Sequence, residues 1–136
     1  PLPAKPGDRI RITSGSRSGL DQMQNVLGGG PLLLQNGRIV LNGRAEGFSS
    51  GFLALAASRT VVGQGQGGTW LLTMRGIGGG GPTLLETALA AKQLGLRDAL
   101  NLDGGSSTTV VAGGSTVMNG RGGPPRIHNG LGLIPL

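Results

Sequence analysis

Glycine is the residue that most constrains what this chain can fold into. It contributes 29 of the 136 residues, and proline contributes another 8. Glycine adopts backbone conformations that other residues avoid, and it interrupts regular helices and strands. A chain punctuated so often is expected to form short strands joined by tight turns. Glycine and proline at this level also occur in disordered low-complexity chains. The apolar content therefore has to distinguish a folded domain from a disordered chain.

The apolar content favours a folded domain. Hydrophobic residues make up 37% of the chain, the mean hydropathy is +0.06, and apolar runs recur from end to end. That is enough for a modest core, and 136 residues fit one domain spanning residues 1–136. The chain has no cysteine, which excludes disulfides and thiol catalysis. No apolar stretch approaches the 18 residues of a membrane span.

The charge is basic but dispersed. The net charge is +6 and the isoelectric point is about 11.6, yet only 13% of residues are charged. The arginines are scattered from Arg9 to Arg126, and Phe48, Phe52 and Trp70 are the only aromatic side chains. Nucleic acid is therefore not the expected partner, because such binders gather basic and stacking residues on one face. Smaller anions, phosphate included, fit the pattern better.

Alternating and β-branched residues predict a series of short strands. Asn36-Gly37 between two apolar runs predicts a tight hairpin turn, and residues 65–68 predict a second one. The predicted strands are residues 9–12, 32–34, 38–41, 60–64, 69–74, 99–102, 108–112, 115–118 and 131–134.

One principal helix is predicted at about residues 83–94. Thr83 with Glu86 three residues later is a capping-box pattern, leucine and alanine then recur at helical spacing, and Gly95 follows as a stop signal. The expected fold class is therefore α/β of the α+β kind. It would be a mixed β-sheet of short strands and hairpins with one helix packed on it.

The segment with the most chemistry is residues 101–109, NLDGGSSTT, here called the signature segment. An apolar strand delivers Asn101 and Asp103 to the same face, because they are two residues apart. A glycine turn and a cluster of hydroxyl groups follow. Strand ends of this kind hold ligand sites in many sheets. The structural alternative is an aspartate that only satisfies the amides of its turn.

Taken in order, a set of motifs resembles the phosphodiester glycosidase family. The resemblance covers most of the chain and corresponds to the C-terminal part of the family's domain. Its motifs are GD at 7–8, LGGGPLL at 27–33, NG at 36–37, EGF at 46–48, SRTVVG at 58–63, TLLE at 83–86, the signature segment, NG at 119–120, Arg126 and NGL at 129–131.

The resemblance implies hydrolysis of a sugar-1-phosphodiester with an N-acetylglucosamine-like sugar. It implies an enzyme that is secreted, periplasmic or bound to the cell envelope, acting on envelope or extracellular polysaccharide. Such chemistry needs a carboxylate near the anomeric carbon and cations for the phosphate. The catalytic candidates are Asp103 and Glu86; the substrate-binding candidates are Arg59, Arg126, Asn101, Gly104, Gly105, Ser107 and Thr108.

No cofactor is expected, and no spacing of His, Asp and Glu predicts a transition-metal site. The one cation considered is Ca²⁺, held by Asp103 with Asn101 and neighbouring hydroxyl groups.

Several candidates also have structural alternatives. Glu86 can serve only as the capping partner of Thr83, Arg59 can pair with Glu46, and Arg126 can be a surface residue. His128, the single histidine, is either structural or an acid/base group.

Two departures from the family pattern keep a second function open. Arg75 stands where the family usually has Asp, and Ser106 replaces the third glycine of the signature. The family's domain also has an N-terminal half that this sequence does not contain. The alternative function is therefore a non-catalytic module of the same fold that binds glycan or phosphate. In either case an N-terminal half or a partner chain would complete the domain.

Overall fold

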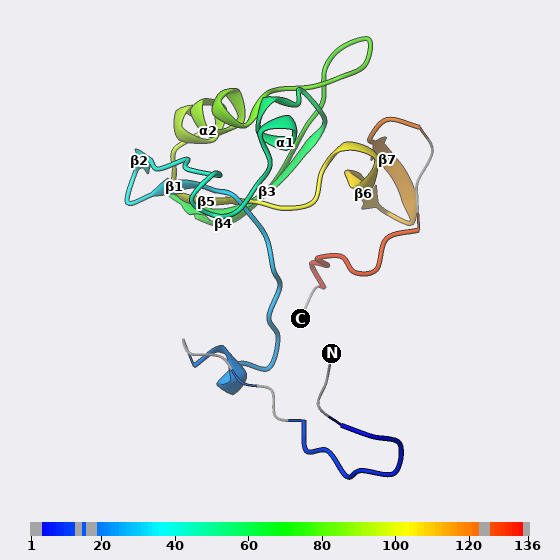
Figure 1. Ribbon diagram of the computed structural model, residues 1–136. Helices are drawn as coiled ribbons and strands as arrows, with labels where there is room; N and C mark the ends of the chain where they lie inside the picture. The colour runs from blue at the N-terminus through cyan, green and yellow to red at the C-terminus, as the bar shows by residue number, and fades with distance from the viewer. Residues whose placement is uncertain (1–3, 13–14, 16–18, 123–125, 135–136) are drawn as a thin grey trace.

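A computed structural model describes residues 4–12, 15, 19–122 and 126–134. Its body is a five-stranded sheet of order β2-β1-β5-β3-β4, with a separate two-stranded sheet formed by β6 and β7 (Figure 1). The strands are β1 (Leu32–Gln35), β2 (Arg38–Ile39), β3 (Arg59–Gly65), β4 (Gly68–Met74), β5 (Leu96–Asn101), β6 (Thr109–Ala112) and β7 (Ser115–Asn119). The helices are α1 (Ser50–Ala54) and α2 (Leu84–Gln93), with single 3-10 turns at Leu20–Gln22 and Gly105–Ser107.

The predicted α+β class with one principal helix is confirmed. Among the described residues every strand pair is antiparallel. Tight hairpins join β1 to β2, β3 to β4 and β6 to β7, and α2 connects β4 to β5, which lie on either side of β3.

The hairpin predicted at Asn36-Gly37 is confirmed. Leu34 pairs with Ile39 and Gln35 with Arg38, and the two residues between them have φ values of 51° and 76°. Two successive positive φ values are what a two-residue turn needs to follow the twist of its strands. The turn also contacts β5, because the amide of Asn36 donates to the Asp98 carboxylate at 2.9 Å.

The second predicted hairpin is confirmed as well. β3 and β4 pair along seven residues, from Arg59 opposite Met74 to Gly65 opposite Gly68. The other edge of β3 pairs with β5, which makes β3 a central strand. The β6–β7 hairpin turns through Gly113 and Gly114, both with positive φ.

α2 begins and ends where the sequence predicts. The Thr83 hydroxyl accepts from the Glu86 amide, the Glu86 carboxylate accepts from the Thr83 amide, and Gly95 follows with φ 89°. Both helices lie on the same side of the sheet (Figure 1). The buried residues of α2 join those of the sheet in one core, which consists of Leu33, Leu34, Val61, Leu84, Ala88, Ala91, Leu96 and Ala99.

The opposite side of the sheet is here called the open face. Thr60 pairs with Thr73 and Val62 with Leu71, and cross-strand partners point to the same side. Because Val61 between them is buried in the core, these four residues point away from it. No described helix covers them, and Leu71 is 44% exposed.

Two predicted strands do not form. Residues 9–12 and 131–134 have no strand structure, and Ile12 and Leu133 are 84% and 85% exposed. Alternation predicts a half-buried strand only where a neighbouring strand pairs with it, and no strand in the described part of the chain pairs with either segment. In Figure 1 the N-terminal residues extend away from the sheet.

The sequence does not predict the short helix α1. Five residues are too few for helical periodicity, although Ser49 caps the helix by accepting from the Phe52 amide at 3.2 Å.

Within the described ranges, no helix has both the length and the apolar character that a membrane crossing needs.

Candidate functional site

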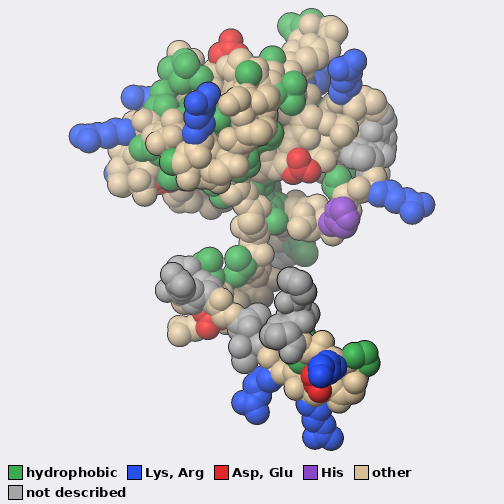
Figure 2. Space-filling view, in the orientation of Figure 1, with side chains coloured by type: hydrophobic (Ala, Val, Ile, Leu, Met, Phe, Trp, Pro, Cys, Tyr) green, Lys and Arg blue, Asp and Glu red, His purple; other side chains and the backbone are tan. Residues whose placement is uncertain are grey.

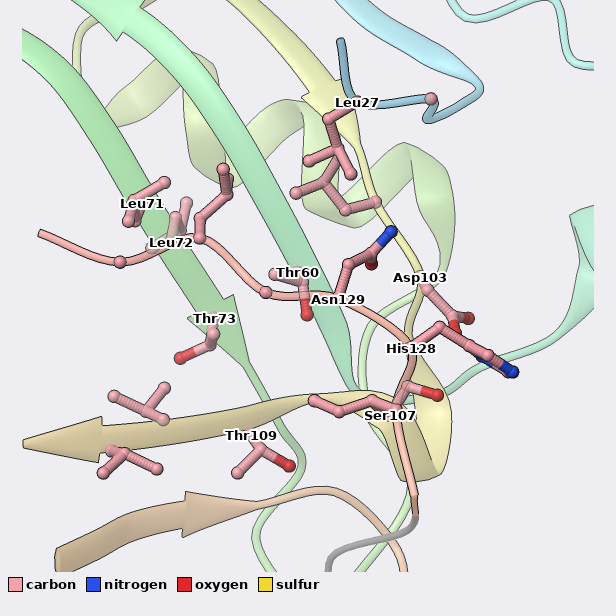
Figure 3. A pocket seen from close by; sticks show the side chains of 18 of the residues that line it. Leu27, Thr60, Leu71, Leu72, Thr73, Asp103, Ser107, Thr109, His128 and Asn129 are labelled. Atoms are coloured by element: carbon pink, nitrogen blue, oxygen red, sulfur yellow. The ribbon is translucent and has the colours of Figure 1, made fainter. Parts of the chain in front are cut away.

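A cavity of about 1170 Å³ lies on the open face, where β5 ends. Its walls come from segments far apart in sequence. They are residues 26–28, Thr60 of β3, residues 71–73 of β4, residues 102, 103 and 107, residues 109–111 of β6, and residues 126–133, here called the closing segment. The cavity is shown in Figure 3.

Asp103 lines this cavity from the second position after β5, which ends at Asn101. The strand end is fixed by the Leu102 amide, which donates to the Thr60 carbonyl at 2.8 Å. One carboxylate oxygen of Asp103 accepts from the Gly104 amide at 2.9 Å. The aspartate therefore does stabilise its own turn, and its exposed side chain still faces the cavity.

Ser107 lines the cavity from the 3-10 turn that follows. The Gly105 amide donates to the Ser58 carbonyl at 2.7 Å, which anchors the turn to the start of β3. A Cβ added at Gly104 would lie 2.7 Å from that same carbonyl, and Gly105 has φ 62°. Gly104 is thus needed for the close approach of two backbones and Gly105 for its positive φ, and neither lines the cavity.

The closing segment brings Arg126, His128 and Asn129 to the same cavity. Figure 3 shows His128 at the same end as Asp103 and Ser107. Three predicted site residues from two distant segments, Asp103, Ser107 and Arg126, therefore line one cavity. His128, for which the sequence allowed either role, lies with them. On the face that Figure 2 shows, the other basic side chains are scattered over the body of the molecule and over the N-terminal stretch below it.

Asn101 and Thr108 are buried and do not line the cavity. The Asn101 amide nitrogen donates to the Gly30 and Leu102 carbonyls, both at 2.8 Å. The Thr60 hydroxyl donates to that of Thr108 at 3.2 Å. These two side chains hold the end of β5 and the signature segment in place beneath the cavity.

Glu86 lies on α2, outside the cavity. Its carboxylate accepts from the Thr83 amide at 2.7 Å and from the Thr83 hydroxyl at 2.8 Å, and these hydrogen bonds lower its pKa. The structure thus shows it in the capping role that the sequence offered as an alternative.

Arg59 also lies outside the cavity, and it is only 2% exposed. Its Nε donates to the Pro82 carbonyl at 3.3 Å, its Nη2 donates to the Leu55 carbonyl, and its guanidinium lies 5.7 Å from the centre of the Phe52 ring. Burial lowers its pKa by desolvation. Glu46, its suggested partner, instead accepts from the Leu32 amide.

No group of three or more metal-ligating side chains occurs within residues 4–12, 15, 19–122 and 126–134. The Ca²⁺ ligands that the sequence suggests are Asp103, Asn101 and neighbouring hydroxyl groups. In the structure the Asn101 amide nitrogen donates to two backbone carbonyls.

Comparison with known proteins identifies a family that this chain matches. The family model described as phosphodiester glycosidase matches residues 2–134. A hypothetical protein from Synechocystis is similar in structure, with 40% sequence identity and a TM-score of 0.67, over 77% of this chain and 20% of its own. The zebrafish N-acetylglucosamine-1-phosphodiester alpha-N-acetylglucosaminidase catalytic domain, auto-inhibited by its pro-peptide, has 27% identity and a TM-score of 0.58, over 68% of this chain and 34% of its own. No curated protein matches significantly. The chain spans a fifth and about a third of these two solved chains.

Proposed function

Because the chain belongs to the phosphodiester glycosidase family, we propose that it hydrolyses the glycosidic bond of a sugar-1-phosphodiester. The observation that carries the proposal is the cavity, which is lined by a carboxylate, a hydroxyl group and an arginine from distant segments. The sugar we propose is similar to N-acetylglucosamine, in keeping with the name of the zebrafish neighbour.

The chemistry assigns one role to each of these groups. Water attacks the anomeric carbon through an oxocarbenium-like transition state, and Asp103 takes the proton of that water. The bond from carbon to the phosphate oxygen breaks, and its electron pair leaves with the phosphate monoester. Arg126 binds the phosphate oxygens, for which a guanidinium is suited. Ser107 donates to or accepts from a hydroxyl group of the sugar.

His128 adds a second proton-transfer group to the proposal. An imidazole can accept and donate a proton, and this one lies at the same end of the cavity as Asp103 (Figure 3). It would donate to the departing phosphate oxygen. That need is moderate, because a phosphate monoester, with a second pKa near 6, is already a good leaving group.

A binding module without catalysis is the second candidate. Glycosidases commonly use two carboxylates across the scissile bond, and Asp103 is the one carboxylate in the described lining of the cavity. Glu86, the second predicted carboxylate, lies on α2. The cavity would then hold a sugar phosphate without cleaving it.

The proposal extends to the setting of the reaction. The chain spans only part of the solved relatives. We therefore propose that an N-terminal half or a partner chain completes the domain. We also propose a secreted, periplasmic or envelope location and an envelope or extracellular polysaccharide as the source of the substrate.

The test is the release of N-acetylglucosamine from its methyl 1-phosphodiester. The parent chain should release sugar, and Asp103→Asn should reduce the rate at least about 100-fold while N-acetylglucosamine-1-phosphate still binds. The matched control is Asp21→Asn, an exposed carboxylate outside the cavity. A parent chain that binds without releasing sugar is the binding module. A chain that does neither refutes both functions.

A further inference from the structure

The lining of the cavity is polar at one end and apolar along the rest. Asp103, Ser107 and His128 lie together at one end, whereas Leu71 lies at the opposite side (Figure 3). The apolar lining continues onto two further elements, through Val110 and Val111 of β6 and Leu131 of the closing segment. A sugar phosphate bound at the polar end would leave this apolar part unoccupied.

The apolar part is accessible from solvent. Leu71 and Val111 are 44% and 62% exposed although they line the same cavity. A single exposed leucine needs no explanation, but apolar side chains gathered from several elements into one concave surface mark a site for an apolar ligand. The surface is also continuous with the polar end that the proposed function assigns to the sugar and the phosphate.

The substrate has two ends that match this division. A phosphodiester carries the sugar on one oxygen and a second alcohol, the aglycone, on another. With the phosphate held by Arg126, an aglycone that follows the cavity reaches Leu71 and Val111. We infer that the aglycone is a long alkyl or isoprenoid alcohol, so that the substrate is an amphiphilic sugar-1-phosphodiester. This inference rests on the proposed function.

The expected size of the effect follows from hydrophobic burial. A methylene group taken fully out of water improves binding up to about fourfold. On an open surface one side of the chain stays wet, so about twofold per methylene is expected. Seven added methylenes should therefore improve binding by about 100-fold. The gain should appear in KM rather than in kcat, because the aglycone contacts are the same in ground state and transition state.

The experiment uses the methyl, butyl and octyl phosphodiesters of N-acetylglucosamine, below the concentrations at which they form micelles. For the parent chain, KM should fall steadily from methyl to octyl. Binding of the corresponding alkyl phosphates, measured by calorimetry, gives the same comparison without catalysis. Leu71→Ser should weaken the dependence on alkyl chain length both of KM and of alkyl phosphate binding. The matched control is Leu89→Ser on α2, which is equally exposed but outside the cavity, and it should leave both unchanged.

Each outcome of this experiment supports or refutes the inference. If methyl and octyl esters are hydrolysed with the same KM, the proposed function stands and the amphiphilic substrate is refuted. Binding that improves with chain length, without any hydrolysis, supports the apolar site and refutes the catalytic function. If no ester is hydrolysed and no alkyl phosphate binds, the proposed function and the amphiphilic substrate are both refuted. If chain length has no effect and Leu71→Ser converts a dimer into a monomer on sedimentation, a second copy covers the surface and the inference is wrong.

Discussion

A buried guanidinium is costly unless its N–H groups find acceptors. Arg59 finds them in the carbonyls of Leu55, which ends α1, and Pro82, which lies just before α2. The start of β3 is thereby connected to the ends of two other segments. Its neighbour Ser58 in turn holds the Gly105 amide. Arg59 thus supports the signature segment from the side of the sheet opposite the cavity.

The substitution Arg59→Ala should lower the free energy of unfolding by about 2–4 kcal/mol, because two inward-facing carbonyls lose their donor. Urea denaturation measures the loss. Arg121→Ala, at an exposed arginine, is the control and should change little. If Arg59→Ala leaves stability intact and weakens phosphate binding, the residue is the phosphate ligand that the sequence predicted.

Glu86 has a pKa that its hydrogen bonds to Thr83 lower. A carboxyl group with a depressed pKa in the folded state stabilises the fold above its ordinary pKa, and this contribution disappears as the pH falls through the lowered value. Glu86→Gln should therefore be less stable than the parent at pH 7. The two should converge below about pH 4. Melting temperatures across this range check the prediction, with Asp21→Asn as the control for loss of a surface charge. A loss of hydrolysis at unchanged stability would instead assign Glu86 to catalysis.

The residues of the signature segment show how far sequence alone can predict a site. The apolar run before Asp103 predicts a strand end, and Asp103 and Ser107 lie there beside the cavity. Their neighbours Asn101 and Thr108 are equally polar but buried. Their partners, the Gly30 carbonyl and the Thr60 hydroxyl, are 71 and 48 residues away in sequence. Nothing in the local pattern separates a ligand contact from such long-range structural bonds.

Among the elements, the hairpins and α2 depend on local signals. Asn36-Gly37 readily adopts the two positive φ values that its turn needs, and the Thr83–Glu86 capping box satisfies its own backbone groups, so the sequence predicts both well. The strands expected at 9–12 and 131–134 need a neighbouring strand, and no described strand pairs with them. Pairing is a property of the whole fold, which a single segment does not encode.

The turn between β1 and β2 gives a test at this scale. Gly37 has φ 76°, where a side chain costs about 1 kcal/mol or more. Gly37→Ala should lower the free energy of unfolding by that amount, as measured by thermal or urea denaturation. Gly51→Ala, inside α1 with open space for the added Cβ, should leave it unchanged or raise it. Equal effects of the two substitutions would contradict the assigned turn.

At the scale of the whole molecule, the two faces of the sheet have different roles. α1 and α2 lie on one side, and the core residues fill the space between α2 and the sheet (Figure 1). The other face carries the cavity, whose walls come from the two strands β3 and β4, from β6 and from the loop regions around them. Such an arrangement places variable loops on a rigid support, which is how many ligand sites are built.

The central claim is that this cavity binds the sugar phosphate, and backbone amide NMR tests it most directly. Titration with N-acetylglucosamine-1-phosphate should shift the amides of Asp103, Ser107, Arg126 and His128 along one saturable curve. Free N-acetylglucosamine, which lacks the anion, should shift them far less. Saturable shifts gathered around Glu86 and Thr83, or around Arg59 and Leu55, would place the site on the helix-covered side of the sheet and contradict the account.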